Sequence, residues 1–237
     1  PTRTSPYPMS RLAPPVELVD VAREIQRADE LTSAIAGGKL GLIAQDSASG
    51  HYGLGPLAMQ LGLISLQQFD PIRLATARLP ALAEDVGQTV AIAVWGAHGP
   101  TIVRTQEAPA PVHVAMRHGA VMSLRGTASG RLFAAHLARS VVRAASGEAG
   151  GDKPFDKAFE QALAAIRSAG FSHAVDAAVP GVSGLAAPVF DGSGALVLSL
   201  TAIGATQAFD TRAAGKPAAA LRRCAGELSA QLGAPVA

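Results

Sequence analysis

The spacing of apolar residues predicts two short helices and a two-stranded hairpin near the start of the chain. Residues 16–26 carry apolar side chains at roughly helical spacing, and a shorter helical pattern follows and ends at the pair 37–38, Gly-Gly. The apolar run 40–44, the polar tip DSASG and the return at residues 51–53 are typical of a hairpin. This order of elements predicts a winged helix-turn-helix over residues 1–54.

An apolar helix is expected next. Pro56 suits the first position of a helix, and 57-LAMQLGLISLQQF-69 is apolar on most faces. A helix that pairs with a second copy of itself has such a pattern, so residues 55–70 are predicted to be a linker helix. A further helix is expected over residues 71–87, with a kink at Pro80.

From residue 88 the pattern indicates an antiparallel sheet with helices packed against it. Residues 88–96 and 100–107 flank a short turn, and residues 184–204 contain two apolar runs joined by the turn sequence DGSG. A third strand is expected at residues 112–119. Helical patterns cover Ser129–Arg139, Phe155–Ala169 and Lys216–Leu232. The predicted fold class is therefore α/β, of the α+β type, over residues 71–237.

Composition is typical of a globular chain. Of the 237 residues, 49% are hydrophobic and 16% are charged, which is unlike a disordered protein. Each apolar run is interrupted before the roughly 18 residues of a membrane span, and the first segment, PTRTSPYPMSRLAPP, lacks the apolar core of a signal peptide. We therefore expect a cytoplasmic protein with no membrane partner.

Cysteine and histidine give little sign of redox or metal chemistry. The single cysteine, Cys224, excludes an internal disulfide and lies in a helical pattern, where we expect a buried thiol. The six histidines show no H-x-H or H-x-x-x-H spacing, so no metal site is expected, and we expect no other cofactor.

Four stretches of the sequence resemble the IclR family of bacterial transcriptional regulators. They are 50-GHYGLGPLAMQLG-62, 119-GAVMSLRGTASGRLFAA-135, 166-IRSAGF-171 and 181-GVSGLAAPVFDGSGALVLSLTAIG-204, of which the last is the most specific. The resemblance implies a winged helix-turn-helix, a linker helix and a GAF-like effector-binding domain. It also implies a homodimer or tetramer that binds double-stranded operator DNA and a small organic-acid effector.

The resemblance assigns the DNA contacts to the N-terminal domain. Thr32 and Ser33 lie in the second helix of the motif, where polar side chains can reach base edges or phosphates. The other candidates are basic residues near the two helices and a histidine of the wing: Arg23, Arg27, Lys39 and His51.

The charge of the N-terminal domain leaves a second function open. Residues 1–54 contain five basic and six acidic residues, a net charge of −1, whereas DNA-binding domains usually neutralise phosphates with basic side chains. The alternative is a GAF-like small-molecule sensor whose N-terminal domain serves in dimerisation and does not read DNA.

A Gly/Ser-rich loop that runs into a helix, 126-GTASGRLFAA-135, is the main candidate for binding an acid. The first amides of the helix, those of Ala128 and Ser129, are expected to face outward at the positive end of the helix dipole. Such amides bind a carboxylate without a charged side chain. The alternative is that Thr127 and Ser129 only cap the helix.

The resemblance places the hairpin 184–204 opposite this loop. It assigns a backbone amide to Gly184, a hydroxyl group to Thr201 and a further backbone contact to Asp176. Ile203 stands where the family often has a second serine, which favours an aromatic or longer-chain carboxylate over a short keto acid.

Two larger side chains are expected on the apolar side of the same cavity. They are Met122 and Trp95.

Two other site classes are not expected. The segment 53-GLGPLA-58 satisfies G-x-G-x-x-A, but it follows an exposed hairpin, and Pro56 removes an amide from a phosphate-binding turn. The serines in 126-GTASG-130 and 181-GVSG-184 do not match G-x-S-x-G, and no motif places a histidine or an acid beside them. We therefore predict that the chain is not an enzyme.

Overall fold

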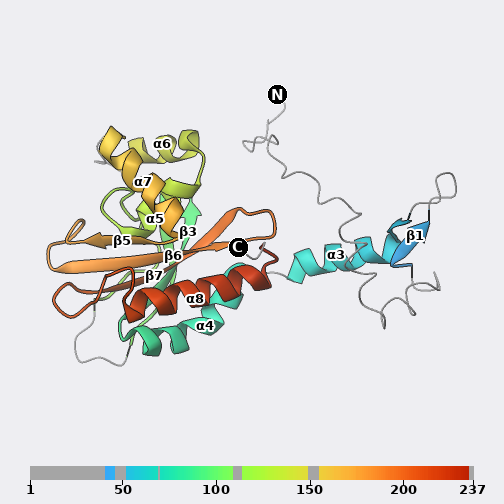
Figure 1. Cartoon of the computed structure of the whole chain (residues 1–237), viewed down its shortest axis with the longest axis horizontal. Helices are drawn as coiled ribbons and strands as arrows, with labels where there is room; N and C mark the ends of the chain where they lie inside the picture. Colours follow the sequence, from blue (N-terminus) through green and yellow to red (C-terminus); the bar gives the residue numbers. More distant parts are fainter. Residues whose placement is uncertain (1–40, 46–51, 69, 109–113, 149–154, 235–237) are drawn as a thin grey trace. The chain divides into compact units, whose positions relative to one another are not determined.

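The computed structural model describes residues 41–45, 52–68, 70–108, 114–148 and 155–234 (Figure 1). The chain divides into two compact units, Pro1–Asp70 and Pro71–Ala237. The division into three domains made from the sequence stays a prediction. The two helices predicted before residue 37 lie outside the described residues.

The first unit contains the predicted hairpin and the helix after it. Strands β1 (Ile43–Gln45) and β2 (Tyr52–Leu54) pair antiparallel, with Ile43 opposite Leu54. Helix α3 (Pro56–Gln68) begins at the predicted proline. The strand before 53-GLGPLA-58 is thus antiparallel to its partner, unlike the buried parallel strand that precedes a nucleotide-binding loop.

Gly55 fixes how the hairpin joins helix α3. A Cβ atom at this position would lie 2.2 Å from the carbonyl oxygen of Gly41, so no other residue fits without a backbone shift. The close approach lets the Gly55 amide donate to the Leu42 carbonyl at 2.7 Å, and the Leu57 amide donates to Gly41 at 2.9 Å. These bonds hold the first turn of the helix against the hairpin.

The second unit is a five-stranded antiparallel sheet with helices on both faces. The strand order is β4-β3-β7-β6-β5. In chain order its elements are α4 (Pro71–Val86), β3 (Thr89–Gly96), β4 (Gly99–Gln106), α5 (Ala128–His136), α6 (Arg139–Glu148), α7 (Lys157–Ala169), β5 (Ser172–Val175), β6 (Val182–Phe190), β7 (Leu196–Ala205) and α8 (Lys216–Gln231).

Alternation along the strands divides the core between the two faces. Leu198 and Leu200 of β7 are fully buried in the main cluster with Leu79 of α4 and Leu221 of α8. Helices α4 and α8 lie side by side on that face, and α5, α6 and α7 lie on the other (Figure 1). Burying a leucine side chain contributes about 2 kcal/mol, so this cluster dominates the packing of the sheet.

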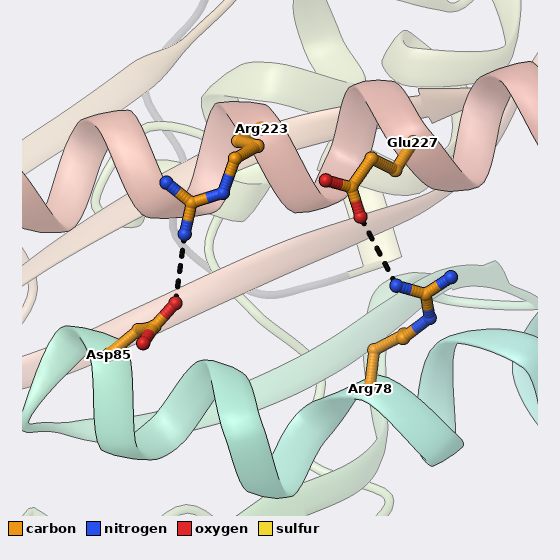
Figure 2. Close-up of polar contacts among 4 residues, drawn as sticks. All are labelled: Arg78, Asp85, Arg223 and Glu227. Atoms are coloured by element: carbon orange, nitrogen blue, oxygen red, sulfur yellow. Dashed lines mark hydrogen bonds and ion pairs between the residues drawn. The ribbon is translucent and has the colours of Figure 1, made fainter.

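Two ion pairs join α4 to α8 at the surface (Figure 2). Arg78 pairs with Glu227 at 3.1 Å, and Asp85 pairs with Arg223 at 2.8 Å. The later residue on α4 pairs with the earlier one on α8, which shows that the helices run antiparallel. All four side chains are at least 40% exposed, so each pair contributes about 0–1 kcal/mol.

The strand predicted at residues 112–119 is wrong in its described part. Residues 114–117 have no regular structure, and Gly119 lies in a turn with φ 79°. This loop nevertheless follows the edge of β4, because the Gly119 amide donates to the Ile102 carbonyl at 2.7 Å and the Ile102 amide to Ala120 at 3.0 Å. The loop takes the place of an edge strand beside β4.

The helix predicted over Ser129–Arg139 corresponds to α5, and α6 was not predicted from the sequence. Helix α5 ends at His136, because the backbone of Leu137 is extended (φ −85°, ψ 159°), and α6 starts at Arg139. Strand β5 was not predicted either. The other helices predicted after residue 55 and the hairpins β3–β4 and β6–β7 are confirmed within a few residues, and α4 is one helix that contains Pro80. No helix within the described ranges has the length and apolar character to cross a membrane.

Candidate functional site

Small side chains cover the middle of the sheet on the face towards α5. On β7, Ser199 and Thr201 alternate with the leucines of the opposite face. Thr201 lies between Ala91 of β3 and Ala186 of β6, and Ile203 lies beside Gly184. Directly paired residues project from the same face of an antiparallel sheet, so the surface beneath α5 is low there. Helix α5 packs on this face, and space remains between the helix and these small side chains.

Helix α5 begins directly over this low surface. Thr127 is its N-cap: its side chain accepts from the Gly130 amide at 3.0 Å, and its carbonyl accepts from the Arg131 amide at 3.0 Å. The amides of Ala128 and Ser129 have no partner in the described part of the chain, as the geometry of a first helical turn leads one to expect. They are available to an anion.

Buried hydroxyl groups connect α5 to β7. The Oγ of Ser129 lies 2.6 Å from the Oγ1 of Thr201, which lies 3.3 Å from the Oγ of Ser199. All three residues are at most 4% exposed. Because either hydroxyl of each pair can be the donor, this chain can rotate to give or to accept one hydrogen bond at its end.

A cavity of about 110 Å³ lies between the start of α5 and the sheet. None of the described residues that line it carries a charged side chain. Its lining consists of Met116, Met122, Gly126, Thr127, Ala128, Ser129, Ala174, Ala178, Val179, Val182, Ser183, Gly184, Thr201 and Ile203. The polar groups are main-chain amides and hydroxyls, and the rest of the wall is apolar, as in many small-molecule sites.

The loop before α5 is attached to α7 by an ion pair and a ring contact. Arg125 donates to the Oδ2 of Asp156 at 2.9 Å, and its guanidinium carbon lies 4.4 Å from the centre of the Phe159 ring. Asp156 is the N-cap of α7. The pKa of Asp156 is lowered, first by the hydrogen bond from the Phe159 amide and then by that from Arg125. Both contacts favour the charged carboxylate.

A second arginine braces the same loop from inside. Arg131 donates through Nε to the carbonyl of Arg125 at 2.6 Å and through Nη1 to the carbonyl of His173 at 3.2 Å. Burial, and then the charge of Arg125, lowers the pKa of Arg131. This residue thereby links the loop to the edge strand β5.

Five of the seven residues predicted for the effector line this one cavity. They are Met122, Ala128, Ser129, Gly184 and Thr201.

The other two, Trp95 and Asp176, do not. Trp95 packs on Phe133, with ring centres 5.9 Å apart, and Phe133 lies more than a helical turn beyond the start of α5. Asp176 was assigned a backbone contact, but its amide donates to the Val182 carbonyl at 3.2 Å.

Several lining residues were not singled out from the sequence as ligand contacts. They are Met116, Gly126, Ala174, Ala178, Val179, Val182 and Ser183. One signal was present: in 197-VLSLTAIG-204 large and hydroxyl side chains alternate, which marks one face of β7 as polar and small. The loops that close the cavity carry no comparable periodic signal.

The structure does not test the residues predicted to contact DNA. Arg23, Arg27, Thr32, Ser33, Lys39 and His51 all lie outside the described residues.

Comparisons with known proteins give one consistent family. Residues 64–230 match the family described as "Bacterial transcriptional regulator IclR C-terminal". Pseudomonas aeruginosa HmgR is 30% identical, with a TM-score of 0.81, 95% of this chain covered and 93% of that one. A search of the curated proteins gives no match.

More distant structures share the fold. The Agrobacterium tumefaciens repressor BlcR has a TM-score of 0.71 at 20% identity, with 92% of this chain and 90% of that chain covered. Thermotoga maritima IclR has a TM-score of 0.61 at 18% identity and covers 94% of each chain.

The family match is consistent with the observed fold. Membership in a family of transcriptional regulators also confirms the prediction that the chain is not an enzyme. The match covers more than half of the chain, and the HmgR relationship extends over nearly all of it. The chain belongs to the IclR family of bacterial transcriptional regulators.

Proposed function

We propose that this regulator binds operator DNA as a homodimer or tetramer in the bacterial cytoplasm, and that a small organic acid in the cavity modulates this binding. The observation that carries the proposal is the cavity itself. It combines unpaired amides at a helix start with a hydroxyl pair and an otherwise apolar wall. Family membership supports the DNA-binding part.

The groups around the cavity favour a carboxylate. The amides of Ala128 and Ser129 can donate two hydrogen bonds at the positive end of the α5 dipole, and the hydroxyl of Ser129 or Thr201 can donate a third. Because no side chain is charged among the described lining residues, a cation would find no counter-charge there, nor would the second charge of a dianion. One negative charge matches this end of the cavity.

The apolar part of the lining favours an apolar body on the ligand. Met116, Met122 and Ile203 supply flexible or branched apolar surface. An aromatic or longer-chain carboxylate fits this wall better than a short keto acid. The ligand then changes operator affinity only if it binds two arrangements of the protein unequally.

A thermal-shift screen tests the ligand class first. The full chain is heated with benzoate, phenylacetate, octanoate and pyruvate, and a ligand of the native state raises the melting temperature by mass action. The aromatic and longer-chain acids are expected to stabilise more than pyruvate. If none of the four raises the melting temperature of the folded chain, the ligand class is wrong.

Operator binding is tested on DNA selected from a random double-stranded library. Wild type and a Ser129→Leu variant should bind the selected sequence with equal affinity, while only wild type should respond to the acid found in the screen. The bulky side chain fills the cavity and leaves residues 1–54 unchanged. An acid response that persists in Ser129→Leu would contradict the cavity as its origin.

The charge of the N-terminal region favours a second candidate, a GAF-like small-molecule sensor that does not read DNA. Residues 1–54 have a net charge of −1, which gives little attraction to phosphates. Failure to enrich any sequence from the library at low salt, together with a positive ligand screen, would favour the sensor.

A further inference from the structure

The turn at residues 176–181, between β5 and β6, borders both the cavity and the solvent. Ala178 and Val179 line the cavity, yet Val179 is 55% exposed and Ala178 is exposed as well. A residue that borders both the cavity and the solvent belongs to the wall between them. The conformation of this turn therefore determines how far that wall closes.

Asp176 begins the turn in an unusual backbone conformation. Its φ is 50°, and it is the one non-glycine residue with a positive φ in the described part of the chain. This region disfavours side chains, although aspartate and asparagine tolerate it better than most residues. Gly181, at the other end of the turn, has φ 80°, so both ends are in conformations that need a stabilising contact or a glycine.

The carboxylate of Asp176 supplies the contact. Its Oδ1 accepts from the Gly181 amide at 2.8 Å and from the Oγ1 of Thr206 at 2.7 Å. The Thr206 amide in turn donates to the Gly181 carbonyl at 2.9 Å. One carboxylate oxygen thus closes the turn on itself and ties it to the segment that follows β7.

The same hydrogen-bond chain reaches the cavity. The Oγ of Ser183, a buried lining residue, lies 2.8 Å from the Oγ1 of Thr206. Thr206 uses its single hydroxyl proton towards Asp176, so Ser183 is the donor to Thr206. The direction of the chain from Ser183 to Asp176 is therefore set by the carboxylate, which can only accept.

The turn also contacts the loop before α5. A Cβ atom at Gly126 would lie 3.3 Å from the Cβ of Ala178, tighter than most such contacts. The glycine lets the turn and the loop approach each other where both line the cavity. A shift of the turn would increase the distance between the turn and this loop.

We propose that Asp176 is a positioning residue: through Gly181 and Thr206 it holds the 176–181 turn as the outer wall of the cavity and thereby limits the size of the ligand. The limit on ligand size rests on the proposed function, whereas the role of Asp176 in holding the turn does not. Asp176 does not line the cavity and acts through Ala178 and Val179, which do.

Hydrogen exchange of the full chain without ligand tests the wall. Asp176→Asn keeps the Oδ1 acceptor and tolerates the positive φ at this position. Asp176→Gly tolerates the positive φ but has no acceptor, and Asp176→Ala provides neither. In Asp176→Asn, the amides of Gly181 and Val182 should exchange at the wild-type rate. In Asp176→Ala they should exchange about threefold to tenfold faster, because roughly one hydrogen bond is lost. Exchange in Gly should be intermediate.

Asp191 offers a matched control. Its Oδ1 closes the β6–β7 turn in a similar way, accepting from the amides of Ser193 and Ala195 at 2.9 and 3.0 Å, and it does not line the cavity. Asp191→Ala should accelerate exchange in its own turn and leave residues 176–182 unchanged. Equal rates in wild type and Asp176→Ala, or equal rates in the Asn and Ala variants, would overturn the positioning role.

Ligand selectivity tests the consequence for size. Dissociation constants are measured for benzoate and for the bulkier naphthalene-2-carboxylate. Asp176→Ala should weaken benzoate about threefold to tenfold and narrow the preference for benzoate over the larger acid, while Asp176→Asn and Asp191→Ala keep the wild-type ratio. An unchanged ratio in Asp176→Ala would overturn the size limit. If neither acid binds wild type, the proposed ligand class fails, and the exchange rates still decide whether Asp176 holds the wall.

Discussion

The hydroxyl oxygens of Ser129 and Thr201 lie 2.6 Å apart, although the two residues are 72 positions apart in the sequence. The pair fastens the first turn of α5 to the central strand β7, at the place where the helix amides face the cavity. Both side chains are at least 96% buried, so neither hydroxyl can exchange its partner for bulk water. The hydrogen bond therefore has a structural role as well as the proposed role in binding.

Thr201→Val should destabilise the fold by about 1–3 kcal/mol, because the shape is kept while the buried Ser129 hydroxyl loses its partner. The free energy of unfolding is measured with a denaturant. The double variant Ser129→Ala with Thr201→Val removes both groups, and it should cost less than the sum of the single variants. Additive costs would show that the two hydroxyls are not coupled.

Two helix glycines should respond to alanine in opposite directions. At Gly130 a Cβ atom would lie 2.0 Å from the Ser123 carbonyl oxygen, whereas at Gly226 nothing lies within 4 Å. Gly130→Ala must therefore push the loop from the start of α5 and destabilise the fold by several kcal/mol, about the cost of severe overpacking. Gly226→Ala should stabilise it by about 0.5–1 kcal/mol.

Thermal melts of the two glycine variants, read beside wild type, give the comparison directly. A Gly130→Ala protein as stable as Gly226→Ala would mean that the loop at Ser123 has room to move.

His136 should make the fold less stable in mild acid. Its ring packs against Phe190, with ring centres 5.2 Å apart, and its buried Nε2 has no hydrogen-bond partner among the residues that the structure describes. Burial, followed by the charge of Arg167, lowers its pKa below 6.5. The unfolded chain then takes up a proton at a higher pH than the native chain does. Stability is fully present above the unfolded pKa and is lost as the pH falls through the folded pKa.

The measurement is the free energy of unfolding between about pH 7 and about pH 5. His136→Phe should flatten the slope because the variant has no proton to bind there, while a change of the exposed His173 to Gln serves as the control. An equally steep slope in His136→Phe would assign the pH dependence to other groups.

Ile203→Ser should change which acid the cavity prefers. The substitution removes a branched apolar side chain and adds a hydroxyl beside Thr201, so affinity should move from benzoate towards pyruvate by about tenfold. Calorimetric titration of both acids measures the ratio. Ile203→Val is the matched control and should keep the preference for benzoate; a ratio that is the same in all three proteins would remove Ile203 from ligand selection.

Local patterns were sufficient for most of the elements. The β6–β7 hairpin follows from two apolar runs and the turn DGSG, whose Asp191 accepts three hydrogen bonds within the turn. The start of α5 follows from Thr127, which caps it as a threonine before a helix usually does. Such features depend on residues only a few positions apart, so the sequence specifies them before any tertiary contact forms.

The failures have a different physical origin. Residues 112–119 carry the composition of a strand, but the chain turns at Gly119 and only follows the edge of β4. Trp95 is large and apolar enough for a cavity wall, but it packs against Phe133 of α5 at the edge of a core cluster. In both cases the outcome depends on which element lies alongside, and that is not encoded in the local spacing.

By itself the sequence determined the hairpins, most helices and the family to which the chain is similar, because periodicity, turn residues and caps act over a few neighbouring positions. Only the tertiary structure decided that five of the predicted residues meet around one cavity, and that the Asp176 carboxylate accepts a hydrogen bond within its own turn and does not line that cavity. The strand order β4-β3-β7-β6-β5 brings residues far apart in the chain into register. The cavity exists because small side chains from three separate strands happen to lie together beneath one helix start.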